Sequence, residues 1–268
     1  MTMLDRILAA LPRDYPWRAG IQYFDSIDST NTYLKKQAAL GAPHGTAAIA
    51  DCQTLGRGRL GRSFQSPSGC GIYLSVLLRP SCPPQDLMHL TCAAAEAMCD
   101  AVETTTGLRP GIKWTNDLVV GNRKIAGILT ENGLNAQGLV DYAIIGTGIN
   151  CCQQPEDFPP ELRSTAGSLA MALGRSVDRP ELAAQMLAAL ARMDDALFTG
   201  KERMLSRYRQ DCITLGKEIS LVRGTEIRHG TALDIGPQGD LIVRFSDTGE
   251  LAPVSSGEVS VRGLYGYV

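Results

Sequence analysis

The pattern of apolar and turn-forming residues changes abruptly at residues 213–216, and this change constrains the fold more than any other feature. Before it, apolar segments typical of strands alternate with segments of helical periodicity. After it, the chain consists of short alternating segments divided by Gly, Pro and Asp, at 217–222, 225–236, 239–245, 251–256 and 259–263. We therefore predict two domains, an α/β domain over residues 1–213 and a small β domain over residues 214–268.

Apolar patterning in the first part predicts a sheet covered by helices. The segment 71–79, GIYLSVLLR, is apolar almost throughout, as expected for a strand buried on both faces. Between residues 85 and 105, apolar positions recur at helical spacing, which predicts a long helix packed on the sheet. The predicted strands are 21–25, 46–51, 71–79, 111–120, 123–131 and 139–150. Helices are predicted within 1–17, 28–41, 85–105 and the Ala- and Leu-rich region 161–212.

Charge and cysteine usage exclude several classes of protein. Lys and Arg number 26 against 28 Asp and Glu, so the chain has no global basic field for nucleic acid or an anionic membrane. The eight cysteines form no CxxC pair and the three histidines are scattered, which argues against a zinc site or a His-dependent triad. The sequence lacks a signal peptide and a membrane-length apolar run. We expect a globular cytoplasmic protein with reduced thiols and no membrane association.

The segment 54–64, TLGRGRLGRSF, has a composition that neither helices nor strands favour. Glycines let a backbone approach a ligand and expose its N–H groups, and arginines add charge-assisted bonds to phosphate or carboxylate. The segment matches neither the P-loop nor the full dinucleotide-binding pattern. We interpret it as an anion-binding loop, with a solvated, flexible basic hairpin as the alternative. Its glycines and arginines are Gly56, Arg57, Gly58, Arg59, Gly61 and Arg62.

A second polar group occupies the segment 111–129, GIKWTNDLVVGNRKIAGIL. It brings Lys113, Asn116, Asp117 and Lys124 onto neighbouring predicted strands. Two lysines with an Asn-Asp pair can stabilise charge on a transferring phosphate and hold a divalent cation. The alternative is an exposed hairpin with ordinary surface charges. Lys124 directly precedes an apolar run, and a lysine at the edge of a buried strand is better placed to face a ligand than to lie free in solvent.

Two shorter motifs lie at strand and helix ends. The segment DSTN places the polar side chains of Ser29, Thr30 and Asn31 where a strand meets a helix, and its simpler interpretation is an N-cap at Ser29 or Thr30. The segment IIGTGIN ends an apolar strand at Asn150, and its simpler interpretation is a strand end followed by a turn. Each motif alone favours the structural interpretation.

Taken in order, DSTN, GRGRLGR, KWTNDL with RKIAGIL, and GTGIN resemble the biotin protein ligases over about residues 21–262. The resemblance implies an α/β (α+β) fold. This fold has a class II synthetase-like, biotin/lipoyl ligase catalytic domain with a mixed sheet, plus a small C-terminal SH3-like β-barrel. It also implies joining of biotin to ATP as biotinyl-5'-adenylate, then transfer to one lysine of a biotin carboxyl carrier protein of acetyl-CoA carboxylase or a related carboxylase. Mg²⁺ on the phosphates is implied, and a tightly bound prosthetic group is not.

The resemblance also implies roles for individual residues. Biotin would be bound by Ser29, Thr30, Asn31, Gln53, Gly56, Arg57, Gly58, Arg59 and Lys124. ATP and the adenylate would be bound by Arg59, Arg62, Phe64, Lys113, Asn116, Asp117, Lys124 and Asn150, with Phe64 stacked on adenine. The catalytic charges would be Lys124, Arg59, Arg57 and Lys113, and Asp117 would contribute to the metal. We further expect the Gly/Arg loop to order over the ligands, shielding the adenylate from water.

The sequence departs from the family pattern at a few positions. Phe64 stands where many members have tryptophan, Thr115 where proline is common, and Leu60 where some members carry a basic residue. None of these changes removes a charge that the chemistry requires. Only about 20 residues precede the first predicted strand, too few for the winged helix-turn-helix of some bacterial members. We therefore expect a short-form ligase that does not bind DNA, and a homodimer, because members often pair through catalytic-domain strands.

Two other functions are compatible with parts of the sequence. The first is a lipoate or octanoate transfer enzyme of the same fold, against which the arginine-rich loop and the C-terminal β segments argue. The second is a non-catalytic adapter whose basic loop binds nucleic acid. The near-neutral charge and the lack of aromatic residues among the arginines argue against it.

Overall fold

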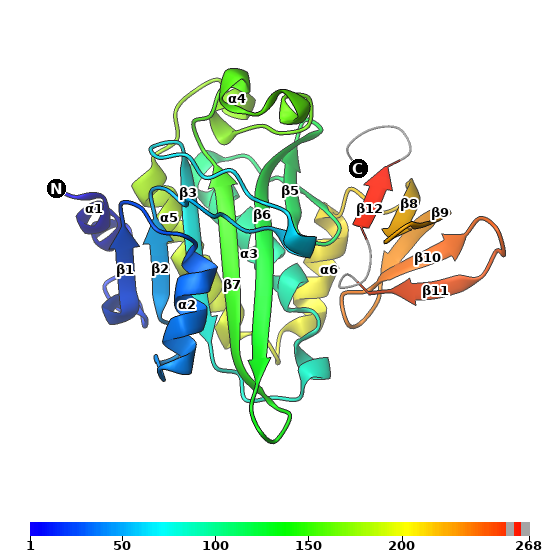
Figure 1. Ribbon diagram of the computed structural model, residues 1–268, viewed down its shortest axis with the longest axis horizontal. Coiled ribbons are helices and arrows are strands. Elements are labelled where there is room, and N and C mark those ends of the chain that lie inside the picture. The colour runs from blue at the N-terminus through cyan, green and yellow to red at the C-terminus, as the bar shows by residue number, and fades with distance from the viewer. Residues whose placement is uncertain (256–259, 264–268) are drawn as a thin grey trace.

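The computed structural model describes residues 1–255 and 260–263 (Figure 1). Its centre is a seven-stranded mixed sheet in the order β1-β2-β3-β7-β6-β5-β4, in which β1 and β2 are parallel and the other neighbours antiparallel. The strands are β1 (Ile21–Phe24), β2 (Ala47–Ala50), β3 (Gly71–Leu78), β4 (Gly111–Lys113), β5 (Asp117–Val120), β6 (Arg123–Leu134) and β7 (Val140–Asn150).

Helices cover both faces of this sheet, which explains why β3 is buried along its whole length. On one face, α3 and α5 pack together against β3, β5 and β6, and α1 and α6 pack on this layer. On the other face, Leu34 and Ala38 of α2 pack on Ala48, Leu77 and Ile144. The helices are α1 (Met3–Ala10), α2 (Thr30–Ala39), α3 (Leu90–Thr106), α4 (Leu169–Leu173), α5 (Arg179–Asp195) and α6 (Lys201–Asp211). Short 3-10 turns lie at Arg18–Gly20, Arg59–Gly61, Pro84–Leu87, Pro155–Asp157 and Pro160–Leu162.

The prediction of one strand over residues 111–120 is wrong. The chain reverses after Lys113, and β4 pairs antiparallel with β5 so that Lys113 lies opposite Asp117. The reason is tertiary. The backbone N–H of Trp114 donates to the Thr214 hydroxyl at 2.9 Å, and the Tyr208 hydroxyl donates to the Thr115 carbonyl at 3.1 Å. These contacts from residues far along the chain hold a turn that local periodicity does not reveal.

A second sheet follows the helices. It has the antiparallel order β11-β10-β9-β8-β12 and lies beside α6 (Figure 1). Its strands are β8 (Glu218–Arg223), β9 (Glu226–Ile235), β10 (Leu241–Phe245), β11 (Leu251–Val254) and β12 (Ser260–Gly263). We call these five strands the C-terminal sheet. The predicted strand segments 251–256 and 259–263 extend to residues 256 and 259, which lie outside the described residues.

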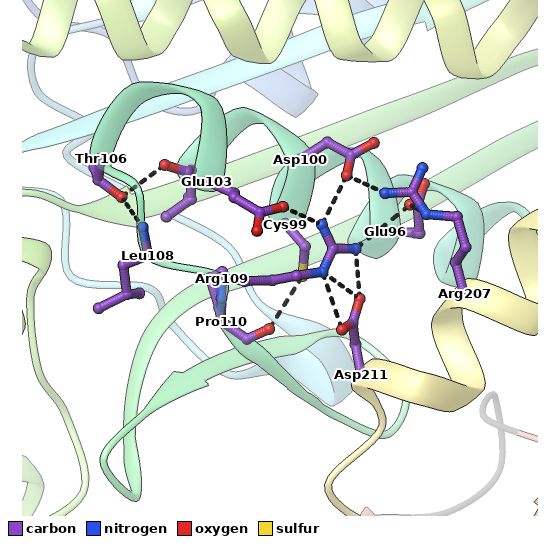
Figure 2. A network of polar contacts seen from close by, with 11 residues as sticks. Glu96, Cys99, Asp100, Glu103, Thr106, Leu108, Arg109, Pro110, Arg207 and Asp211 are labelled. Carbon is purple, nitrogen blue, oxygen red and sulfur yellow. Dashed lines mark hydrogen bonds and ion pairs between the residues drawn. The ribbon is translucent and has the colours of Figure 1, made fainter.

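An ion-pair cluster ties α6 to α3 and to the segment before β4 (Figure 2). The Arg109 guanidinium lies 2.6 Å from Asp211 and 2.8 Å from both Asp100 and Glu103. Arg207 of α6 pairs with Asp100 and with Glu96, the latter at 2.8 Å. The cluster therefore fixes the helix that leads into the C-terminal sheet. Within the described ranges, none of the helices has both the length and the apolar character needed to cross a membrane.

Candidate active site

Two adjoining cavities open on the α2 side of the central sheet. The inner cavity, of about 140 Å³, is bounded by the start of α2, the loop 53–64 and strands β5, β6 and β7. The outer cavity, of about 330 Å³, lies between this loop and residues 158–166. The residues that line both are Arg62, Ser63, Phe64, Asp117 and Lys124. The predicted residues lining the inner cavity are Ser29, Asn31, Gln53, Arg57, Gly58, Arg59, Arg62, Phe64, Asn116, Asp117 and Lys124.

The start of α2 forms a polar wall of the inner cavity. Ser29 is the N-cap, as predicted, and its hydroxyl accepts from the backbone N–H of Thr32 at 3.4 Å. The backbone N–H and hydroxyl of Thr30 donate to the Gln53 side-chain oxygen at 2.9 and 3.1 Å. These bonds leave the Gln53 amide nitrogen to donate to Ser66 at 3.0 Å. The cap thus has a structural role and also presents polar groups to the cavity.

The Gly/Arg loop is folded back on itself and tied to the sheet. The Phe64 N–H donates to the Gly56 carbonyl at 2.9 Å, and a Cβ at Gly56 would lie 2.2 Å from the Phe64 carbonyl oxygen, so this position requires glycine. Arg57 pairs with Glu131 at 2.9 Å, and Arg59 donates to the Asn116 side-chain oxygen at 2.8 Å. These partners disfavour the alternative of a freely solvated hairpin.

Lys124 stands at the junction of the two cavities. Its Nζ lies 2.7 Å from Asp117 and 6.0 Å from the centroid of the Phe64 ring. The Lys124 backbone is held on both sides, because its N–H donates to the Thr165 carbonyl at 2.7 Å and its carbonyl accepts from Gly167 at 2.9 Å. A cation held in this way can meet groups that enter from either cavity.

The remaining predicted residues lie at different distances from the cavities. Asn150 lines the outer cavity and donates to the Gly167 carbonyl at 2.9 Å. Thr30 stands behind the inner wall, where its hydroxyl oxygen lies 2.7 Å from Ser75 Oγ. Gly56 lies at the base of the loop and lines neither cavity. Lys113 lies in β4 opposite Asp117 and lines neither cavity.

Sequence reasoning missed the glycine floor of the inner cavity. A Cβ at Gly146 would lie 2.0 Å from the Asn31 side-chain oxygen, one at Gly148 would lie 2.5 Å from the Phe64 ring, and one at Gly127 would lie 3.1 Å from Lys124 Nζ. Alternate residues of a strand share a face, so Gly146 and Gly148 in the motif GTG were a usable signal. Glycine at 146 and 148 leaves the space in which Asn31 and Phe64 lie against the sheet, whereas a Cβ at Gly127 would require only a small shift of the Lys124 side chain.

Glu131 was also missed. Its carboxylate accepts from Arg57, from Asn31 at 3.0 Å and from Lys35 at 3.0 Å, and so ties the Gly/Arg loop to α2. Burial alone would raise the pKa of Glu131, but the bonds from Asn31 and Lys35 and the charge of Arg57 outweigh it and lower that pKa. The residue therefore remains an anion at neutral pH.

Comparisons with known proteins agree with this site. Residues 23–150 match the model of the biotin/lipoate A/B protein ligase family, and residues 214–262 match that of the biotin protein ligase C-terminal domain. A biotin–[acetyl-CoA-carboxylase] ligase of Mycobacterium tuberculosis is 33% identical over 237 residues, which cover 86% of this chain and 85% of that protein. The chain belongs to the biotin protein ligase family.

Further similarities within this ligase family support the assignment. The bifunctional ligase/repressor BirA of Bacillus subtilis is 34% identical over 226 residues, covering 84% of this chain and 69% of that protein. The biotin protein ligase of Aquifex aeolicus, solved in complex with biotin and ATP, has 28% identity and a TM-score of 0.76, covering 91% and 99% of the two chains. The predicted ligase fold, a mixed α/β catalytic sheet followed by a small SH3-like β module, is thereby confirmed.

Proposed function

We propose that this chain activates biotin with ATP as biotinyl-5'-adenylate and transfers the biotinyl group to a specific lysine of a biotin carboxyl carrier protein, as expected for an enzyme of the biotin protein ligase family. The observation that carries the proposal is the placement of Lys124 at the junction of the two cavities. We assign biotin to the inner cavity, with its polar wall and glycine floor, and adenosine to the outer one. The biotin carboxylate and the α-phosphate then meet at Lys124.

The first step joins two anionic groups. A biotin carboxylate oxygen attacks the α-phosphorus, a new P–O bond forms, and the bond to the β-phosphate oxygen breaks, so pyrophosphate leaves with its electron pair. Because charge concentrates on the phosphoryl oxygens in the transition state, fixed cations lower the barrier. We assign this role to Lys124 and Arg59, with Arg57 and Arg62 nearby on the loop. A catalytic role for Lys113 remains a prediction, and this residue lines neither cavity.

The second step requires positioning and no side-chain nucleophile. The amine of the carrier lysine attacks the acyl carbon, the amide C–N bond forms, and AMP leaves with the electrons of the C–O bond while the amine gives up a proton to solvent. Holding the adenylate in one geometry supplies much of the rate. The folding of the Gly/Arg loop over the adenylate stays a prediction.

The remaining assignments follow the walls of the cavities. Ser29, Asn31 and Gln53 would bond the ureido ring of biotin, and the backbone of 56–59 would close over it. Phe64 would stack on adenine, and Asn150 would bind near the adenosine. Thr30 and Gly56 would support these walls from behind.

Mg²⁺ would enter as part of the ATP substrate. Mg²⁺ in such sites is held by one or two carboxylates plus phosphate oxygens. Asp117 is the only carboxylate among the described residues that lines both cavities. The part of the chain that the structure describes contains no group of three or more His, Cys, Asp or Glu side chains able to hold a metal by themselves. This donor set fits an ion bound mainly by phosphates, with Asp117 as its protein ligand.

Three further expectations belong to this proposal. The chain would divide into domains 1–213 and 214–268, it would act as a cytoplasmic enzyme, and it would form a homodimer. The expectation that it does not bind DNA stays a prediction. The acceptor is proposed by chemistry, as a carboxylase carrier domain with one reactive lysine.

The deciding experiment is biotin-dependent exchange of labelled pyrophosphate into ATP, followed by mass spectrometry of a carrier domain. We expect exchange with biotin, none with lipoate, and one biotinyl group on the carrier. Exchange with lipoate alone would instead support the lipoate-transfer alternative. No exchange with either acid would contradict a ligase function and favour the adapter alternative.

A further inference from the structure

The turn between β4 and β5 is supported by buried groups from later parts of the chain. The Trp114 backbone N–H donates to Thr214, and the Thr115 carbonyl accepts from the hydroxyl of Tyr208. Thr214 and Tyr208 are fully buried, and Trp114 is 4% exposed. Buried polar contacts of this kind hold a backbone strongly, because breaking one leaves an unpaired polar group in the interior.

The C-terminal sheet supplies a third support. Trp114 Nε1 donates to the carbonyl oxygen of Gly239 at 3.0 Å, across 125 residues of sequence. Gly239 lies in the turn 236–240 between β9 and β10 with φ of +78°, and a Cβ there would lie 2.9 Å from Cys92 Sγ. This turn is therefore seated tightly against the start of α3, and its carbonyl points at the indole.

The residues that follow Trp114 hold the two principal cations of the site. The Asn116 side chain accepts from Arg59 at 2.8 Å and donates to the Ile128 carbonyl at 3.0 Å. Asp117 pairs with Lys124 at 2.7 Å. A shift of the turn would thus move the partners of both cations together. Misplacement by about 1 Å can cost a reaction of this type roughly 100-fold in rate.

We infer that Trp114 is a positioning residue for adenylate formation, and that the turn 236–240 of the C-terminal sheet seats it. The inference rests on the proposed function. Through the bond between Trp114 and Gly239, the C-terminal sheet would help to align the residues of the adenylation site. Among the described residues, the turn 236–240 lines neither cavity, and the printed hydrogen bonds of Ser29 and Gln53, which form the wall assigned to the biotin ring, do not reach it. We therefore expect KM for biotin to change less than kcat.

The chain provides a matched pair of variants, because it has two tryptophans. Trp114→Phe removes the indole N–H and leaves the Gly239 carbonyl with only the weak thiol donor of Cys92 at 3.7 Å. Trp17→Phe makes the same chemical change beside Tyr15 and His44, away from both cavities. We expect Trp114→Phe to lower kcat for biotin-dependent pyrophosphate exchange about tenfold, with KM for biotin within about twofold of wild type. Trp17→Phe should leave both constants unchanged.

Tyr208→Phe provides a second and milder test, because it removes only the hydroxyl that holds the Thr115 carbonyl. We expect a fall of about threefold in kcat, again with an unchanged KM for biotin. If Trp114→Phe does not fold, Tyr208→Phe alone decides. Wild-type exchange in the folded variants, or an equal loss of biotin affinity, would overturn the inference and leave the proposed function standing. Absence of exchange in the wild-type chain would overturn the proposed function and this inference with it.

Discussion

Lys124 Nζ lies 2.7 Å from an Asp117 carboxylate oxygen, and both side chains line the two cavities. The lysine side chain is 30% exposed and the aspartate 18%. Asp117 thus orients the ammonium at the point where a carboxylate and a phosphate would meet. Such pre-orientation lets the charge act in the transition state without rearrangement.

Lys124→Ala should strongly reduce adenylate formation. Removing one preorganised charge-stabilising donor costs about 100- to 1,000-fold in rate, and we expect a loss of this size in biotin-dependent pyrophosphate exchange. Lys217→Ala, at an exposed lysine before β8, is the control and should exchange at the wild-type rate. Wild-type exchange by Lys124→Ala would remove the central catalytic assignment.

Phe64→Ala should weaken ATP binding more than biotin binding. A base stacked on an aromatic ring gains about 1–3 kcal/mol, so we expect KM for ATP to rise about tenfold while KM for biotin stays within about twofold. Phe198→Ala removes a half-exposed ring between α5 and α6 and serves as the control. Equal effects on both substrates would argue against an adenine site at Phe64.

Much of the fold was predictable because its long strands carry strong local signals. The apolar runs at 71–79 and 139–150 become β3 and β7, and the DSTN motif caps α2 at Ser29. The hairpin at 111–120 was not predictable, because the turn depends on Tyr208 and Thr214, about 100 residues away.

The site shows the same division between local and distant signals. The clustered arginines and glycines of the loop are visible in the sequence because they violate ordinary strand and helix composition. Glu131 is a single carboxylate on a strand, and its role appears only when folding brings it to Arg57, 74 residues away.

His89 should make the fold less stable below neutral pH. Its ring is fully buried, and burial lowers its pKa despite the bond from the ring to the Leu197 carbonyl at 2.9 Å. The unfolded chain takes up the proton at the ordinary pKa of 6.5, so the free energy of unfolding falls as the pH drops below that value. Urea unfolding should therefore give a smaller free energy of unfolding at about pH 5.5 than at about pH 7.5, with this group contributing to the difference.

A matched pair of variants isolates this contribution to stability. His89→Gln should reduce the difference in unfolding free energy between the two pH values. His229→Gln, at an exposed histidine of β9, should leave the difference unchanged. An unchanged pH dependence in His89→Gln would show that other groups cause it.

Arg109→Met should destabilise the fold far more than loss of an ordinary surface ion pair. Arg109 faces three carboxylates within 2.8 Å, and these raise its pKa despite partial burial. Without the guanidinium, these acids would repel one another. Of the residues labelled in Figure 2, Arg207 would be the cation left beside them. Removing one partner of a buried pair costs about 3–5 kcal/mol, and because the Arg109 side chain is 24% exposed we expect the free energy of unfolding in urea to fall by about 3 kcal/mol.

The control is Arg6→Met. The pair of Arg6 with Asp178 is half-exposed at 3.2 Å, so this variant should lose less than about 1 kcal/mol of unfolding free energy. Because the cluster fixes α6, which carries Tyr208, Arg109→Met should also lower the rate of pyrophosphate exchange in the fraction that stays folded. Equal losses of stability in the two variants would show that the Arg109 cluster contributes no more than a surface ion pair.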